Sequence, residues 1–153
     1  MHRRAFSILE LSIVVAILAM LVAIALPQYA NMTERSRFKS THNTFTTFEK
    51  AILLYQADYG DLPNNYYHFE FPEPFANYIK REDWMHRPAI GQYWEWNNPR
   101  TAEYWNSIGC NIAIRDTARP YTLWISFDTA HDDGDLDTGH YRRMGDYLCH
   151  PIK

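Results

Sequence analysis

The stretch Phe6–Leu26 of the 153-residue chain reads FSILELSIVVAILAMLVAIAL, and it decides how the rest of the sequence is interpreted. Only Ser7, Glu10 and Ser12 are polar in this stretch, and residues 13–26 are all apolar. About 20 helical residues, each rising ~1.5 Å, span a hydrocarbon core of about 30 Å. The stretch is therefore predicted to be a membrane-spanning helix.

The residues on either side of this stretch predict its orientation. Arg3 and Arg4 precede it with no acidic neighbour, so the N-terminus is expected in the cytoplasm and the rest of the chain outside it. Three kinds of segment share this pattern: a signal peptide cleaved after the apolar run, an uncleaved signal anchor, and a leader cleaved before the run. Residues 26–29 form a poor small-residue cleavage site, although Ala23 and Ala25 keep the first alternative open.

Glu10 favours the leader cleaved before the run. A carboxylate near the start of a membrane span costs a few kcal/mol and usually marks function. Cleavage before Phe6 would create a charged α-amine, with which Glu10 of a neighbouring copy could pair. Because an unpaired buried charge is costly, such a pair would enforce the register between subunits.

The segment Arg3-Arg4-Ala5-Phe6-Ser7-Ile8-Leu9-Glu10-Leu11 resembles the class III signal of type IV pilins and type II secretion pseudopilins. The resemblance implies that Ala5 precedes the cut, that Phe6 is the new and methylated N-terminus, and that Glu10 is the assembly glutamate. Ala5 departs from the glycine usual in the family, which predicts slower processing. Pro27 matches a proline common in that helix, where a kink or local melting is expected.

The resemblance implies a structural role rather than catalysis. The subunit would sit in the bacterial inner membrane with its head in the periplasm, and would then be extracted into a periplasmic filament of identical subunits. The implied partners are minor pseudopilins, a prepilin peptidase and an inner-membrane assembly platform driven by a cytoplasmic ATPase. Residues 51–63 resemble the helix end of the major pseudopilin. This favours type II secretion over a type IV pilus pilin for adhesion, motility or DNA uptake. A signal-anchored periplasmic binding protein is the alternative from another class.

The expected domains are a leader at 1–5, a transmembrane and assembly helix at 6–27, an amphipathic helix at 28–60 and a globular periplasmic head at 61–153. Beyond Pro27, apolar residues recur with heptad-like spacing at Phe38, Phe45, Ile52 and Tyr59, with Thr41, Phe48 and Tyr55 at offset positions. This stripe predicts a helical face that packs on the head. Gly60, with Pro63 beyond it, is expected to end the helix.

Several segments of the head have strand-like composition. They are Tyr93–Trp96 (a strand or a loop edge), Asn111–Arg115, Tyr121–Phe127 and a segment near Tyr141–Tyr147, with residues 116–120 as a hairpin turn. Together with the long helix they predict an α+β, pilin-like fold, in which the helix packs on a small antiparallel sheet. The tryptophans are expected to form an aromatic core, with ligand-binding loops as the alternative.

The acidic loop, residues 132–139 (DDGDLDTG), is the best candidate for a metal site. Calcium takes about six to eight oxygen ligands, which Asp132, Asp133, Asp135 and Asp137 would help to supply. The loop is not an EF-hand, because Gly139 comes one residue late and Met144 replaces the bidentate glutamate. Major pseudopilins carry calcium in a C-terminal loop, without a residue-by-residue match here, and a solvated acidic turn is the alternative.

The remaining features limit the function. His131 and His140 flank the acidic loop but lack the paired spacing of a transition-metal site. Cys110 and Cys149 would be free thiols in a cytosolic protein, and one disulfide becomes plausible if the head is exported. A net charge of −3 gives no broad basic surface, so no nucleic-acid partner is expected. No catalytic motif is found, so the chain is expected to be a peptidase substrate and not an enzyme.

Overall fold

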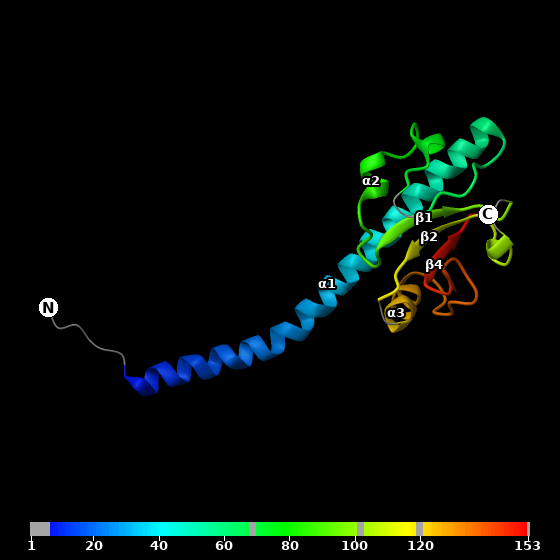
Figure 1. Cartoon of the computed structure of the whole chain (residues 1–153). Coiled ribbons are helices and arrows are strands. Elements are labelled where there is room, and N and C mark those ends of the chain that lie inside the picture. The colour runs from blue at the N-terminus through cyan, green and yellow to red at the C-terminus, as the bar shows by residue number, and fades with distance from the viewer. Residues whose placement is uncertain (1–6, 68–69, 101–102, 119–120, 153) are drawn as a thin grey trace. The chain divides into compact units, whose positions relative to one another are not determined.

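The structure is a computed structural model, and it describes residues 7–67, 70–100, 103–118 and 121–152 (Figure 1). The chain divides into two compact units, Met1–Ser36 and Arg37–Lys153, which are described separately. The long helix α1 (Ile8–Tyr59) contributes to both units. The second unit also contains η1 (Glu73–Phe75), α2 (Arg81–Met85), β1 (Tyr93–Asn97), η2 (Glu103–Trp105), β2 (Asn111–Arg115), α3 (Tyr121–His131), β3 (Arg142–Met144) and β4 (Tyr147–Pro151).

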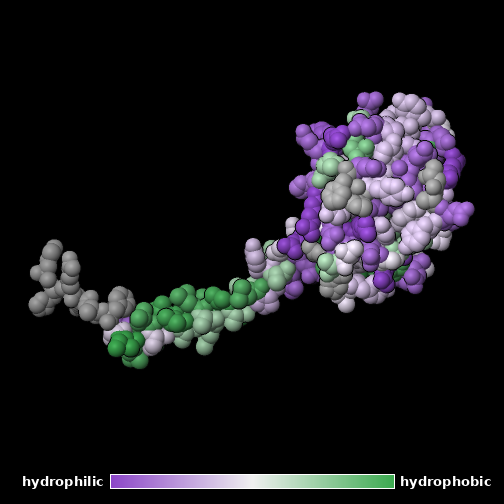
Figure 2. All heavy atoms as spheres, in the orientation of Figure 1, coloured by the Kyte–Doolittle hydropathy of each residue, from purple (hydrophilic) through white to green (hydrophobic). Residues whose placement is uncertain are grey.

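In the first unit, the N-terminal part of α1 exposes its large apolar side chains on every side. Between Ile8 and Leu26 their exposed fractions range from 48% at Val14 to 88% at Ile8. Figure 2 shows this segment as a continuous band of hydrophobic residues. Within the described residues, α1 is long and apolar enough to cross a membrane, which confirms that part of the prediction.

The C-terminal end of α1 is set by Gly60, as the sequence predicts. Gly60 has φ of +75°, and its amide donates to the Gln56 carbonyl at 2.8 Å. A residue with a side chain would be strained in this left-handed conformation, whereas glycine adopts it freely. The helix therefore ends where the chain must turn back toward the sheet.

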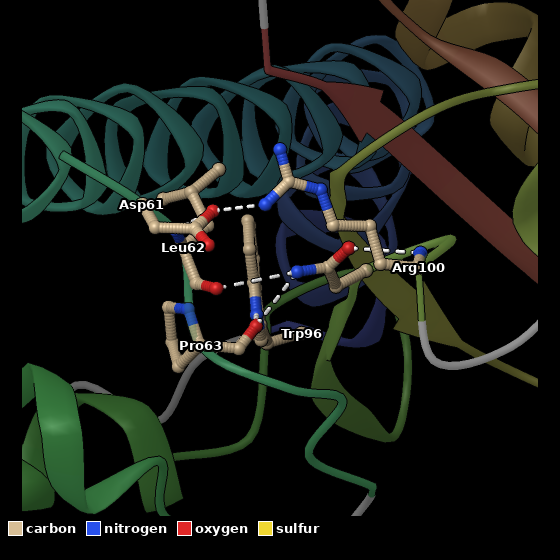
Figure 3. A network of polar contacts seen from close by, with 6 residues as sticks. Asp61, Leu62, Pro63, Trp96 and Arg100 are labelled. Carbon is tan, nitrogen blue, oxygen red and sulfur yellow. Dashed lines mark hydrogen bonds and ion pairs between the residues drawn. The ribbon is translucent and has the colours of Figure 1, made fainter.

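The segment after α1 is fastened to the end of β1 by a polar network (Figure 3). The indole of Trp96 donates to the Pro63 carbonyl at 3.1 Å, and the side-chain amide of Asn98 donates to the same oxygen at 3.0 Å. Arg100 forms an ion pair with Asp61, but both side chains are more than 60% exposed, so the pair contributes little. The partly buried hydrogen bonds to Pro63, rather than this ion pair, hold the segment in place.

A four-stranded antiparallel sheet with the order β1-β2-β4-β3 forms the centre of the second unit. In β2, Ile112 and Ile114 belong to the main core cluster, together with the buried face of α1. Ala113, which points to the opposite face, belongs to a second cluster with Trp105 and Cys149. This alternation of side chains covers both faces of the sheet. The α+β prediction, a long apolar helix with a small antiparallel sheet, is confirmed.

The predicted stripe of α1 is the side of the helix that enters the core. The buried residues of α1 are Phe38, Thr41, Phe45, Phe48, Ala51 and Ile52. Phe45 and Phe48 make edge-on contacts with Trp94, at centroid distances of 5.0 and 5.1 Å. Each such contact is worth about 0.5–1.5 kcal/mol beyond the area that it buries. The stripe ends before Tyr59, which is 63% exposed.

The five tryptophans lie in the core, which confirms the aromatic-core prediction. They are Trp84, Trp94, Trp96, Trp105 and Trp124, and none is more than 5% exposed. Side chains this deeply buried offer little surface to a ligand. Trp84 and Trp94 nevertheless line surface cavities, so the alternative of tryptophan-lined binding loops stays a prediction.

The predicted strand Tyr121–Phe127 is wrong, because these residues begin helix α3. The residues that α3 buries are Trp124, Phe127 and Asp128, at the i, i+3, i+4 spacing of one helical face. The predicted hairpin is wrong as well, because the element that follows β2 is helix α3; residues 119–120 of the predicted turn lie outside the described residues. Packing of this face against the core overrides the strand preference of its aromatic and β-branched residues.

The C-terminal segment forms a hairpin where the sequence predicts one strand near Tyr141–Tyr147. β3 pairs with β4 in antiparallel register, so Met144 lies opposite Tyr147. Gly145 makes the tight connection with φ of +56°. The predicted strands at Asn111–Arg115 and Tyr93–Trp96 are confirmed as β2 and β1.

Candidate functional site

The two residues of the predicted processing site, Ala5 and Phe6, lie outside the described residues. The description begins at Ser7, immediately before α1. The prediction that a peptidase cuts between Ala5 and Phe6 therefore stays a prediction.

Glu10 lies at the start of α1 and forms a capping box with Ser7. The Glu10 carboxylate accepts a hydrogen bond from the Ser7 amide at 2.9 Å, and the Ser7 hydroxyl accepts one from the Glu10 amide at 3.1 Å. Such reciprocal bonds satisfy helix-start donors that would otherwise be unpaired. Glu10 therefore has a local role in this chain, which must be separated experimentally from the predicted role in assembly.

Pro27 lies within α1, and the helix continues on both sides of it. Proline has no amide hydrogen, so the Ala23 carbonyl lacks its usual helical donor. The proline is thus a weak point in the hydrogen-bond ladder. The kink or local melting expected at Pro27 stays a prediction.

The acidic loop follows α3 directly, and its aspartates take different roles. Asp133 accepts hydrogen bonds from the Asp135 amide at 2.9 Å and the Thr138 hydroxyl at 2.8 Å. These bonds lower the pKa of Asp133, so its carboxylate stays ionised. Asp135 accepts from the Asp137 amide at 3.0 Å, which shapes the turn.

A cluster of three carboxylates forms where α3 meets the acidic loop. Oxygens of Asp128, Asp132 and Asp133 lie within 4.8 Å of one another. Asp135 and Asp137, also expected as calcium ligands from the sequence, lie outside this cluster. The structure thus brings together two of the four predicted residues and adds Asp128. We call Asp128, Asp132 and Asp133 the carboxylate cluster.

Asp128 is the most deeply buried carboxylate of the cluster. Its side chain is fully buried, and neither carboxylate oxygen makes a hydrogen bond of normal geometry to a described residue, although the Gly134 amide and the Asp133 carboxylate lie close enough to affect its pKa. Burial, and then the charges of Asp132 and Asp133, raise the pKa of Asp128 to about 6. A buried carboxylate without a normal hydrogen bond is costly, and a bound cation would remove that cost.

The backbone of the acidic loop brings its carboxylates close together. Gly139 has φ of +69°, and a Cβ added there would lie 2.0 Å from an oxygen of Asp132 and 2.9 Å from one of Asp133. Only glycine leaves room for both carboxylates at this point. The carboxylate cluster fits a hard cation such as calcium, which prefers carboxylate oxygens and would complete its coordination with backbone oxygens or water.

The two cysteines are free thiols in the structure. Cys149 pairs with Ala113 in the sheet and lies in the second cluster, whereas Cys110 packs against the main core on the other face. The Cys110 carbonyl accepts from the amide of Ile152, so the two cysteines are also out of register. A disulfide requires Cα atoms within about 7 Å and facing side chains. The structure therefore favours the free-thiol alternative over the disulfide.

Comparison with known proteins gives no relative for this chain: no family model, curated protein or solved structure matches it.

Proposed function

We propose that this chain is a structural subunit of a periplasmic filament, a pseudopilin of a type II secretion system. In this proposal a prepilin peptidase cuts before Phe6, and the exposed part of α1 first holds the subunit in the inner membrane. The same helix then packs with its copies when the filament grows. The chain acts mechanically and performs no chemistry of its own.

The observation that carries this proposal is the contrast between the exposed apolar residues of α1 and its buried stripe. Apolar side chains from Ile8 to Leu26 cover the whole circumference of the helix and bury nothing within the chain. Exposed apolar area costs about 25 cal/mol per Å² in water, so this segment requires lipid or other helices around it. A filament subunit uses both environments in turn.

Glu10 supports assembly over a simple membrane anchor. A capping box needs a side-chain acceptor at this position, which an uncharged glutamine also provides. A charge there adds an insertion cost that capping alone does not require. Pairing with the free amine of a neighbouring subunit would offset that cost.

Mass spectrometry of the mature N-terminus tests the proposal. We expect a chain that begins at Phe6, with an N-methyl group. A chain that keeps Met1 would indicate a signal anchor, and one that begins near Pro27 would indicate a cleaved signal peptide; either result contradicts the proposal. If processing occurs, a filament outside the cell instead of in the periplasm would indicate a type IV pilus pilin.

A second candidate function, calcium binding by the head, rests on the carboxylate cluster. The buried carboxylate of Asp128, which makes no hydrogen bond of normal geometry to a described residue, is the specific observation that favours it. Bound calcium would neutralise Asp128, Asp132 and Asp133 and would stabilise the head. Isothermal titration of the metal-stripped protein with calcium should give saturable binding, and no heat of binding would contradict this candidate.

A further inference from the structure

The acidic loop is held at its C-terminal end by a hydrogen bond to α1. The Nδ1 atom of His42 lies 2.6 Å from the hydroxyl of Tyr141, whose side chain is 1% exposed. Burial raises the pKa of Tyr141 above its usual value, so the phenol keeps its proton and can donate to the imidazole. His42 thus fixes the first residues after the loop.

The N-terminal end of the acidic loop contacts the same residue of α1. His131, the last residue of α3, stacks on His42 with ring centroids 4.6 Å apart and planes inclined by 24°. The Nδ1 atom of His131 lies 3.0 Å from the Phe127 carbonyl, which fixes the orientation of the ring. Asp132 and Asp133 follow His131 directly in the chain.

Contacts within the acidic loop join these two ends. The His140 amide donates to the carboxylate of Asp132, which closes the loop on itself. In the middle, Leu136 is 2% exposed in the core, and its carbonyl accepts from the Arg143 amide at 2.7 Å. A displacement of either end would therefore be transmitted to the carboxylate of Asp132.

We propose that His42 is a positioning residue, which holds both ends of the acidic loop and couples α1 to the carboxylate cluster. Its coupling to cation binding rests on the calcium candidate above. Among the described residues, α1 supplies no carboxylate to the cluster, yet through His131 and Tyr141 it sets where Asp132 and Asp133 lie. Cation binding and the docking of α1 on the head would then stabilise each other.

Amide hydrogen exchange of the full-length protein in detergent, with metal removed by chelator, tests the positioning role. The variants are His42→Phe, which keeps a ring but removes the acceptor, and Tyr141→Phe, which removes one oxygen. We expect each to speed exchange at the amides of Asp135, Asp137 and His140 by about fivefold, the effect of one net hydrogen bond. Amides of the β1–β2 ladder should keep their protection.

Two further comparisons separate positioning from general destabilisation. The double variant His42→Phe/Tyr141→Phe should be no worse than either single variant, because both remove the same bond. His86→Phe, at an exposed histidine outside this contact, should leave exchange unchanged. Additive effects in the double variant, or equal loss of protection in the β1–β2 ladder, would overturn the proposal.

Titration of the same variants with calcium tests the coupling to cation binding. We expect calcium affinity to fall by about fivefold in both single variants and to stay unchanged in His86→Phe. Unchanged affinity in Tyr141→Phe, the smallest alteration, would overturn the coupling. If the wild-type protein binds no calcium, the calcium candidate fails, and the exchange measurement alone decides the role of His42.

Discussion

The two parts of α1 differ in where their apolar side chains lie. From Ile8 to Leu26 the helix is apolar on all sides and exposes every large side chain. From Phe38 to Ile52 it is apolar on one side only, and that side is buried in the head. The same helix thus differs along its length: its first part has an apolar surface that no described residue covers, whereas its second part packs into the core of the second unit.

The largest difference between the two parts of α1 is expected when a large apolar side chain is truncated in each and the free energy of unfolding of the head is measured. Phe45 is fully buried and contacts Trp94, so Phe45→Ala should lower the free energy of unfolding of the head by about 3–5 kcal/mol. Leu18→Ala, in the exposed part of the helix, should leave the stability of the head unchanged. Denaturant unfolding followed by tryptophan fluorescence measures both. Similar losses in the two variants would contradict the division of α1 into two roles.

Replacing the buried carboxylate of Asp128 should stabilise the head without calcium and should reduce the stabilisation that calcium gives. The pKa of Asp128 is raised to about 6, so its ionised form opposes folding at neutral pH. In chelator, Asp128→Asn should therefore raise the free energy of unfolding by about 1–3 kcal/mol. With calcium at about 100 times its Kd, the wild-type head should gain about 2.7 kcal/mol, and the variant should gain less.

The control for the Asp128 prediction is Asp137→Asn, at an exposed aspartate outside the cluster. It should respond to calcium as the wild type does.

The same raised pKa of Asp128 predicts that the metal-free wild-type head becomes more stable as the pH falls from about 6 toward 3.8, because the folded state then binds the extra proton. Thermal melting across this range measures the effect. An Asp128→Asn variant that is destabilised in chelator, yet fully responsive to calcium, would contradict this account of the cluster.

Protonation of His42 should have a smaller and opposite effect on the stability of the head as the pH falls. Burial, and then the charges of His131 and His150, lower the pKa of His42, so the folded head favours the neutral ring. Its contribution is present above pH 6.5, the unfolded value, and is lost as the pH falls below it. In an Asp128→Asn background, His42→Phe should flatten this decline in melting temperature. An unchanged slope would assign the pH dependence to other groups.

The regular features of α1 and the sheet could be predicted from the sequence because each follows from local physics. The apolar run, the buried stripe and the stop at Gly60 depend on composition and backbone geometry within α1. β2 was recognisable from its alternation. The capping box could have been found from the Ser7-x-x-Glu10 spacing, which is a known helix-start pattern.

Neither helix α3 nor the role of Asp128 could be predicted from the sequence. The position of Asp128 in the cluster depends on α3 being a helix. Residues 121–127 favour a strand by composition, and only packing of Trp124 and Phe127 on the core makes them helical. In a strand, Asp128 and Asp132 would have no fixed relation to a shared site. Because α3 runs to His131, the Asp132 amide donates to the Asp128 carbonyl at 2.6 Å, which places the first aspartate of the acidic loop next to Asp128. The missed helix therefore concealed the third carboxylate of the cluster.

Filament assembly by Glu10→Gln and Ser7→Ala variants tests the central claim most directly. Glutamine keeps a capping acceptor at position 10 but removes the charge, whereas Ser7→Ala removes half of the capping box and keeps the charge. Cross-linking of processed subunits in the cell envelope should detect filaments in Ser7→Ala and at least tenfold fewer in Glu10→Gln. Normal assembly of Glu10→Gln would show that the charge is not needed, and would contradict the account.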